Sequence, residues 1–241
     1  MRTIDALAAA AFLALATFPA RAMDDQAIYW RVDGQVEHRF DYQAPQTEWK
    51  GTAWIGDDSN KLRLFSSGVL DDAGRIDGEG GTKGIDSRIF YSRLISDFWD
   101  AKAGVQVAVF GPGLTRTGFM AGFEGLAPYG FHVDAVGSVS QTGVLSARLD
   151  VDYDILFSQK LIATPYFEAM LASMDDPAIR LGAGLPRLEA GVRLRYEFAK
   201  EFAPYVGVSF EQFTGNTAAF VAQDGDPTSK LRAMVGLKVW F

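Results

Sequence analysis

The 241-residue chain contains no cysteine and only two histidines, His38 and His132. Disulfides therefore contribute nothing to stability, and the fold must close by other means. The chain also has no paired-His zinc motif, no phosphate-binding glycine loop and no G-x-S-x-G sequence. Basic residues are outnumbered, 23 against 30 acidic ones, for a net charge of −7. This balance argues against a nucleic-acid partner, because phosphate binding requires a basic surface.

Long apolar runs are also missing. The longest, Ala6 to Phe18, is about 13 residues, whereas a membrane-spanning helix needs roughly 20. Arg2 precedes this run and the A-x-A sequence Ala20-Arg21-Ala22 follows it. This order is typical of a secretory signal peptide. We therefore expect a signal peptide over residues 1–22, export of the chain, and one mature domain over residues 23–241.

The chain does have regular alternation of apolar and polar residues. From Leu231 to Phe241 every second residue is apolar, and Leu188 to Phe198 shows the same pattern with charged residues between. A period of two indicates a strand with one apolar face. Glycine is frequent (25 residues), aromatic content is 13%, and mean hydropathy is near zero at +0.02. An intermediate average of this kind is typical of a transmembrane β-barrel, in which half of each strand faces lipid.

We predict an all-β fold, a transmembrane antiparallel barrel of twelve strands. The expected strands are Ile28–Tyr42, Gln46–Gly56, Lys61–Leu70, Gly84–Ser96, Phe98–Phe110, Leu114–Glu124, Tyr129–Val139, Val144–Phe157, Leu161–Met174, Leu188–Phe198, Ala203–Phe213 and Lys230–Phe241. Alternate connections are short, as expected for periplasmic turns, and the longer ones are expected outside the cell.

Aromatic residues gather near the expected periplasmic end, where an interfacial girdle would lie. They are Phe98, Trp99, Tyr129, Phe131, Phe198, Phe202, Tyr205 and Phe241. The competing interpretation is a soluble sandwich, which would bury its apolar faces between two sheets and would not need such a girdle.

Strand parity assigns the methionines and histidines to a side of the barrel. Met120, Met170, Met174 and Met234 share a face with charged residues and are expected to point into the lumen. His132 falls on the lumenal face with Asp134, whereas His38 falls on the lipid-facing side. Thioether and imidazole groups suit Cu(I), and carboxylates suit harder ions. Met170 and Met174 with Glu168 are therefore a candidate soft-metal site, although methionine also fills irregular gaps in protein interiors. The full candidate metal set is Met120, His132, Asp134, Glu168, Met170, Met174 and Met234.

Two further features admit more than one interpretation. The lumenal carboxylates Asp150, Asp152 and Asp154 suggest ion selectivity or, as we favour, internal ion pairing with arginines. We expect pairs of Arg193 or Arg195 with Glu168 or Glu211. Catalysis has little support, because His132 is the only plausible base and Ser138 lies six residues away on its strand.

Four segments carry a family resemblance: FWDAKAGVQ (98–106), GLAPYGFHVDA (125–135), ARLDVDYDILFSQKLI (147–162) and LEAGVRLRYEFAKEFAPYVGVSFEQF (188–213). In content and order they resemble the copper resistance protein B family of outer-membrane proteins. The resemblance runs from about Trp54 to Phe241. It implies a barrel that binds copper or passes it across the outer membrane. Many members carry a Met- and His-rich segment before the barrel. Here only Met23 to Ala27 separates the expected cleavage site from the first strand, which puts capture of copper by such an arm in doubt.

The combined prediction is a non-enzymatic protein of the bacterial outer membrane that binds or passes copper through lumenal Met, His and carboxylate ligands. Its expected partners are copper ions, outer-membrane lipid and the outer-membrane assembly machinery, and we expect a monomer. One alternative is a small monomeric outer-membrane channel for small solutes. Another is a membrane-embedded lipid hydrolase that uses His132.

Overall fold

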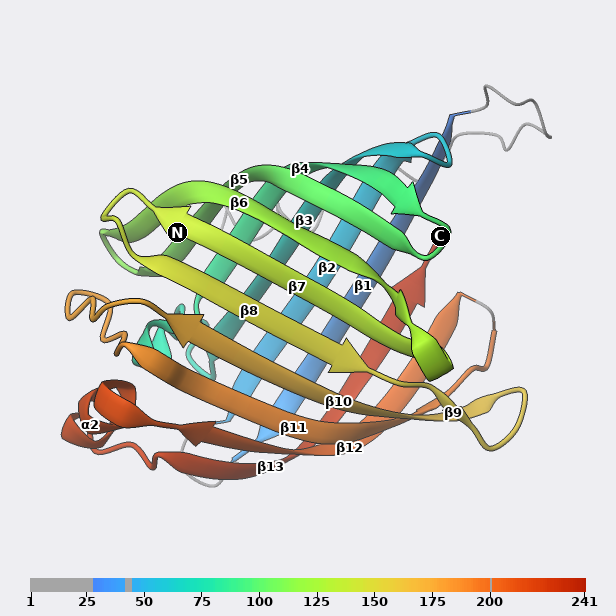
Figure 1. The fold of residues 1–241 in the computed structure, drawn as a ribbon. Helices are drawn as coiled ribbons and strands as arrows, with labels where there is room; N and C mark the ends of the chain where they lie inside the picture. Colours follow the sequence, from blue (N-terminus) through green and yellow to red (C-terminus); the bar gives the residue numbers. More distant parts are fainter. Residues whose placement is uncertain (1–27, 42–44, 200) are drawn as a thin grey trace.

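A computed structural model describes residues 28–41, 45–199 and 201–241 (Figure 1). The expected signal peptide lies outside these residues. The described chain is built from antiparallel strands that wind into one barrel. The strands are β1 (Tyr29–Phe40), β2 (Gln46–Gly56), β3 (Asn60–Asp71), β4 (Ile85–Ser96), β5 (Trp99–Gly111), β6 (Leu114–Ala127), β7 (Phe131–Ser140), β8 (Leu145–Asp152), β9 (Ile155–Leu156), β10 (Leu161–Ala172), β11 (Gly184–Tyr196), β12 (Phe202–Phe213) and β13 (Ser229–Trp240).

The barrel closes because β1 pairs with both β2 and β13. Every strand except the two-residue β9, which pairs with β10 alone, is therefore hydrogen-bonded on both sides. Closure removes the free sheet edges that invite aggregation. Strands β8 and β9 both pair with β10 and share one position in the ring, so the described strands fill twelve positions. This confirms the predicted fold class. The expected strand 144–157 is interrupted at Tyr153 and Asp154.

Side chains alternate between the outer surface and the interior along each strand. On β13, for example, Leu231 is 77% exposed whereas the neighbouring Arg232 is 1% exposed. Large apolar side chains cover the outer face, an arrangement that a soluble protein avoids and a bilayer stabilises. The sandwich alternative is therefore wrong. His38 lies on the outer face beside Phe40, with ring centroids 4.8 Å apart, as parity predicted.

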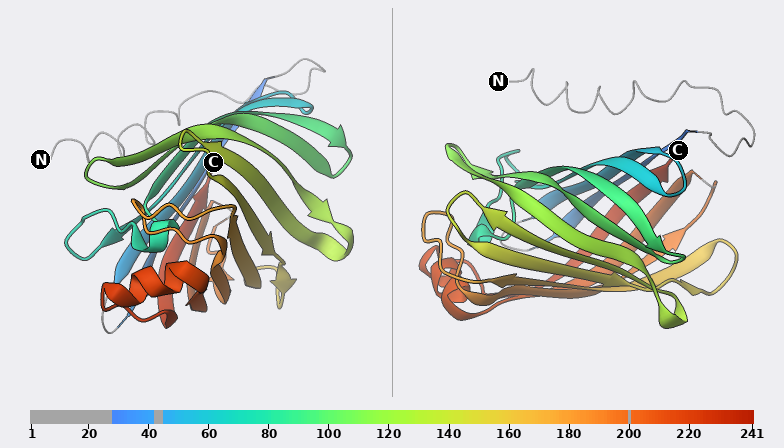
Figure 2. Two further views of the ribbon diagram at one scale, coloured as in Figure 1. Left: turned by 60° about the vertical axis from the view of Figure 1, so that its left-hand side comes forward. Right: turned by 45° about the horizontal axis from the view of Figure 1, so that its top comes forward.

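The two ends of the barrel differ in the length of their connections (Figure 2). At the short-turn end, brief turns join β2 to β3, β4 to β5, β9 to β10 and β11 to β12, and η2 (Pro128–Gly130) joins β6 to β7. At the long-loop end, the β3–β4 connection carries η1 (Glu79–Gly81) and the β12–β13 connection carries α2 (Gly215–Gln223). The sequence did not predict α2. None of the helices in the described part of the chain is long and apolar enough to cross a membrane.

The aromatic girdle at the short-turn end is present with one exception. Phe98, Tyr129 and Phe198 are each more than 60% exposed. Tyr205, which we expected to join them, is 4% exposed and points into the barrel. Alternation along β12 separates its faces, because Val206, Val208 and Phe210 share the exposed one. Tyr205 shares the other face with Ser209 and the buried Glu211, so strand parity places it in the lumen.

Candidate functional site

The lumen contains a continuous line of acidic residues, one from each of six neighbouring strands. Each member is the direct cross-strand partner of the next. In order they are Glu124 (β6), Asp134 (β7), Asp150 (β8), Glu168 (β10), Glu189 (β11) and Glu211 (β12). Strands in a closed barrel are tilted, so a line perpendicular to them climbs the wall. This carboxylate row therefore runs from near the short-turn end to near the long-loop end.

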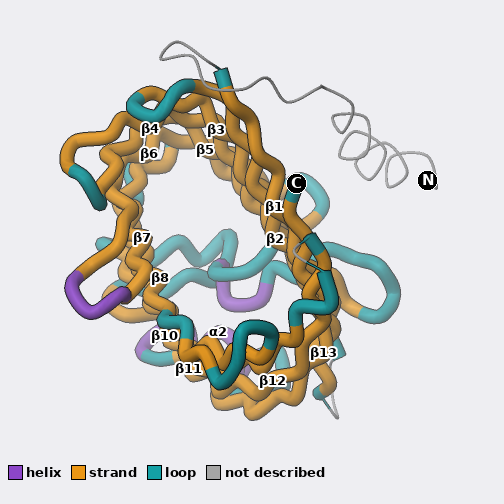
Figure 3. The backbone as a smooth tube through the Cα atoms, turned by 90° about the vertical axis from the view of Figure 1, so that its right-hand side faces the viewer, coloured by secondary structure: helices purple, strands orange, loops and turns teal. Residues whose placement is uncertain are grey.

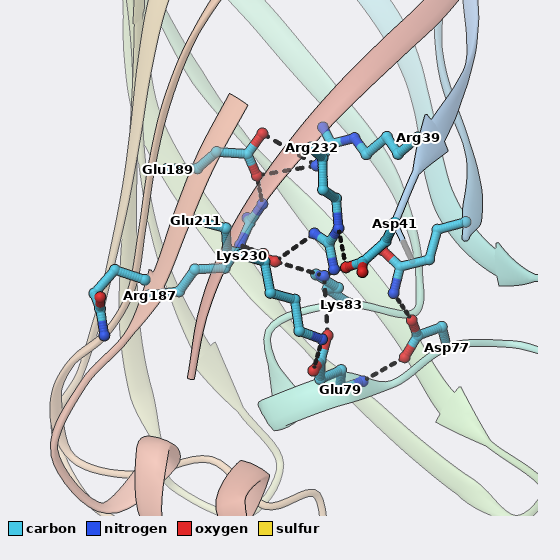
Figure 4. Close-up of polar contacts among 12 residues, drawn as sticks. Arg39, Asp41, Asp77, Glu79, Lys83, Arg187, Glu189, Glu211, Lys230 and Arg232 are labelled. Carbon is cyan, nitrogen blue, oxygen red and sulfur yellow. Dashed lines mark hydrogen bonds and ion pairs between the residues drawn. The ribbon is translucent and has the colours of Figure 1, made fainter. Parts of the chain in front are cut away.

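The upper end of the row lies in a buried ion-pair network (Figure 4). Glu211 has no exposed surface and accepts bonds from Lys83 at 2.9 Å, Arg187 at 2.7 Å and Arg232 at 2.6 Å. Three cations compensate the charge of this one carboxylate, which a buried ion requires.

Lys83 belongs to the β3–β4 connection, so its ion pair ties that connection into the mouth of the barrel. Glu79 in the same connection pairs with Lys83 at 3.1 Å and with Lys230 of β13. Burial opposes ionisation of Glu79, but the two lysines hold its pKa below the ordinary value. The β10–β11 connection and α2 add to this closure, because Thr217 of α2 accepts a 2.7 Å hydrogen bond from the Gly182 amide.

A second group of buried charges crosses the lumen below this network. Arg39 pairs with Glu37 at 2.6 Å and with Glu189 at 3.1 Å. Two tyrosines satisfy the same carboxylates: Tyr205 donates to Glu37 and Tyr166 to Glu189, each at 2.8 Å. Every charge in this group has a partner, as burial demands.

The prediction of internal ion pairs is confirmed in kind, but the predicted partners are wrong. Arg193 pairs with Glu37 at 3.1 Å and lies 3.8 Å from the centre of the Tyr166 ring. Arg195 pairs with Asp154 at 2.6 Å. Glu37 is 156 residues from Arg193 in sequence, so only the closure of β1 onto β13 brings the two within reach.

Two cavities lie inside the barrel. The upper cavity, of about 150 Å³, extends toward the long-loop end, where Lys83 and Leu181 line it. The lower cavity, of about 330 Å³, extends toward the short-turn end, where His132 and Lys238 line it. Four residues line both cavities, and we call them the waist: Glu48, Lys50, Asp150 and Glu168.

Two of the candidate metal ligands are packed into the wall rather than facing a cavity. Met120 is 3% exposed and packs against Phe90 and Val136. Met234 is 2% exposed and packs between Tyr166 and Tyr205. Both sulfurs point inward, in agreement with parity, but apolar and aromatic groups surround them.

The other candidates are distributed along the height of the lumen. Met170 lines the upper cavity, Glu168 belongs to the waist, and His132 lines the lower cavity with Nδ1 3.1 Å from Asp152. Asp134 binds Lys102 at 2.6 Å.

Met174 lies beyond the end of β10, in the β10–β11 connection, and is 46% exposed. A register shift between Met170 and Ala172 interrupts the alternation before Met174, so parity does not place its side chain. Among the described residues, no group of three or more His, Asp or Glu side chains is arranged to hold a metal ion. The candidate ligands therefore lie at successive heights along the lumen and do not form one cluster.

Sequence reasoning missed Glu48 and Lys50. The signal was available, because Gln46, Glu48, Lys50 and Thr52 alternate with Thr47, Trp49, Gly51 and Ala53. Applying strand parity to this segment would have placed both charges in the lumen.

Comparisons with known proteins agree with this structure. A sequence profile of the family described as copper resistance protein B precursor matches residues 28–241. The copper resistance protein B of Escherichia coli is 34% identical over 221 residues, 91% of this chain and 72% of its own. A copper resistance protein B homolog of Pseudomonas syringae pv. tomato is 35% identical over 193 residues, 80% of this chain. The match covers 63% of that Pseudomonas relative, less than two thirds of its length.

Solved structures show the same fold at low sequence identity. The NanC porin has a TM-score of 0.54 and 13% identity, covering 86% of this chain and 98% of the porin. The KdgM porin, solved with disordered oligogalacturonate, has a TM-score of 0.50 and 11% identity, covering 87% and 98%. In barrels of this class the short turns face the periplasm and the longer loops face outward. The chain belongs to the copper resistance protein B family and is a β-barrel of the bacterial outer membrane.

Proposed function

We propose that this barrel contributes to copper resistance by binding copper ions in its lumen and passing them along it. The observation that carries the proposal is the serial placement of ligands in a chain of this family. Met170 lines the upper cavity, Glu168 lies at the waist and His132 lines the lower cavity. An ion that enters at either end would meet one candidate ligand after another.

This spacing suits passage better than storage. Thioether and imidazole groups bind copper, and single ligands hold it less tightly than a complete coordination shell. Conduction requires sites that are strong enough to admit an ion and weak enough to release it. Met174 and Asp134 complete the proposed set, at the external connection and beside Lys102. Met120 and Met234 are the least accessible candidates, because each is packed in a buried cluster.

The remaining parts of the proposal concern catalysis, export, membrane insertion and oligomeric state. Family membership and the likeness to porins argue for a non-enzymatic protein. We propose that residues 1–22 are removed on export, that the assembly machinery inserts the barrel, and that it acts as a monomer in outer-membrane lipid. A lipid hydrolase has less support: His132 bonds to Asp152, as a catalytic base would, but Ser138 bonds to Ser146 at 2.8 Å and not to His132.

The direct test replaces the accessible ligands together, as Met170→Ala, Met174→Ala and His132→Ala. The triple variant should lower cell-associated copper or alter copper sensitivity while the barrel still assembles. The matched control is Met120→Leu with Met234→Leu, which removes two sulfurs from buried clusters and should leave copper behaviour unchanged. Copper behaviour in the triple variant identical to wild type would contradict the proposed ligands.

A channel for small solutes is the second candidate, favoured by the two lumenal cavities. Such a channel would show conductance in planar bilayers that neither added copper nor replacement of the methionines changes. The hydrolase would require ester cleavage by the purified barrel that is lost on replacing His132.

A further inference from the structure

The four waist residues come from opposite walls of the barrel. Glu48 and Lys50 point inward from β2, and Asp150 and Glu168 point inward from β8 and β10. Strand β2 is six positions from β8 in either direction round the twelve-position ring. Figure 3 shows β2 and β8 on opposite sides of the lumen. The two cavities meet where these side chains face each other.

The carboxylates at the waist differ in how they are compensated. Glu48 pairs with Arg39 at 2.9 Å and Glu168 pairs with Arg187 at 3.4 Å. Asp150 is the one member of the carboxylate row that accepts no hydrogen bond and forms no ion pair within 4.0 Å in the described residues. Its negative charge is therefore available to an ion in the cavity.

Both arginines are shared with other buried carboxylates. Arg39 also pairs with Glu37 and Glu189, and Arg187 also pairs with Glu189 and Glu211. Glu37 and Glu211 have further cations in Arg193, Lys83 and Arg232. Among the described residues, the charges of the waist without a bound counter-charge are therefore Asp150 and Lys50.

Lys50 provides the opposing charge. It is exposed to the lumen, and among the described residues it has no hydrogen bond and no ion pair within 4.0 Å. Asp150 is the charged group that interacts most strongly with it. Since neither residue is held by a third partner, an ion at this level competes directly with Lys50 for Asp150.

We infer that the waist is the selectivity site of the lumen, where Asp150 attracts small inorganic cations and Lys50 opposes their entry. A carboxylate without a bound cation at the boundary of two cavities attracts cations, as charged rings do in other pores. The role is that of a specificity determinant, independent of the methionines. It rests on the proposed passage through the lumen, and it concerns cations in general, with K⁺ as the probe.

The test is the reversal potential of the refolded mature barrel in planar bilayers under a KCl gradient. Wild type should prefer K⁺ over Cl⁻. Asp150→Asn should lower the permeability ratio about fivefold, the effect of one unit charge acting across roughly 4 Å of water, and Lys50→Gln should raise it by a similar factor. The control is Asp152→Asn, which removes a charge from the same face of β8 in the lower cavity alone and should shift the ratio far less.

The outcomes separate two claims, that the waist is the selectivity site and that ions pass through the lumen. Opposite shifts in Asp150→Asn and Lys50→Gln, with little change in Asp152→Asn, support the waist as the selectivity site. Conductance with the same permeability ratio in all variants would overturn this inference and leave passage intact. Absence of current in wild type and in Glu79→Gln with Lys83→Met, which frees the β3–β4 connection, would overturn both. Heat-modifiable mobility on gels reports folding of each variant, and the two waist substitutions give independent readings.

Discussion

The side chain of Tyr205 on β12 lies over Gly236 on β13, and its phenol ring occupies the space that a β-carbon at Gly236 would need. From this position the hydroxyl donates a 2.8 Å hydrogen bond to the buried Glu37. Because Gly236 on β13 has no side chain, Tyr205 of β12 can extend over it and donate to Glu37 of β1. Gly191 and Tyr166 repeat the arrangement on β11 and β10, where Tyr166 binds Glu189.

Gly236→Ala should therefore destabilise the barrel, because the added methyl group displaces Tyr205 and deprives buried Glu37 of a donor. We expect a loss of about 1–3 kcal/mol in the free energy of unfolding, the usual cost of an unsatisfied buried polar group. Urea unfolding of the refolded barrel measures it. Gly137→Ala is the matched control, since its β-carbon would meet only an ordinary contact at 3.7 Å and it lies on the outer face. Equal stability of the two variants would contradict the proposed role of Gly236.

Removing the charge of Glu211 should be more costly. Glu211→Gln leaves Lys83, Arg187 and Arg232 buried around a neutral group, and breaking a buried ion pair costs about 3–5 kcal/mol. The same unfolding measurement applies. Arg31→Gln serves as the comparison, because Arg31 is half-exposed in its pair with Asp33 and such pairs contribute only about 0–1 kcal/mol. A loss for Glu211→Gln no larger than that for Arg31→Gln would refute the buried-network interpretation.

The β10–β11 connection should loosen in acid. Arg116 of β6 donates to both carboxylate oxygens of Asp176, at 2.8 and 3.0 Å, and this bond lowers the pKa of Asp176 below its ordinary value of 3.8. A lowered pKa means that the stabilisation is complete above the ordinary value and is lost as pH falls through the folded value. Hydrogen exchange of residues 173–183, corrected for intrinsic rates, should be constant near neutrality and rise below about pH 4. Asp176→Asn should abolish this pH step, and a step that persists in that variant would assign it to another group.

The two kinds of methionine should separate in copper assays. Met170→Leu removes a sulfur that lines the upper cavity, whereas Met234→Leu removes one packed between Tyr166 and Tyr205. Both changes conserve volume, so each should cost less than about 1.5 kcal/mol of stability. Copper bound by the refolded barrel should fall for Met170→Leu and stay at the wild-type level for Met234→Leu. The reverse order would place the binding site in the wall.

Strand parity predicted much of the fold and the direction of many side chains. Leu231 and Arg232 are assigned correctly to opposite faces by a period of two alone, and so is His38. The method fails where a strand loses register, and an aromatic side chain near a turn can belong to either face. Tyr205 shares its parity with Glu211 and lies inside the barrel, and Met174 follows a register shift that interrupts the alternation.

The partners of charged side chains were beyond the reach of the sequence. Strand parity predicts that Arg193 points into the lumen, but it does not predict which distant strands close the barrel beside it. Its pairing with Glu37 depends on β1 returning to β13. The same is true of the waist, where Lys50 and Asp150 face each other because β2 and β8 are six positions apart in each direction round the ring. Long-range pairing of this kind follows from topology and not from local pattern.

Copper entry into liposomes is the most direct test of a conducting lumen. Refolded barrel is inserted into vesicles that contain a copper-responsive chelator, and the signal is followed after external copper is added, as Cu(I) and as Cu(II). Wild-type vesicles should fill faster than empty vesicles and faster than vesicles carrying Met170→Ala with His132→Ala. Filling at the rate of empty vesicles, for both oxidation states, would contradict passage of copper through this barrel.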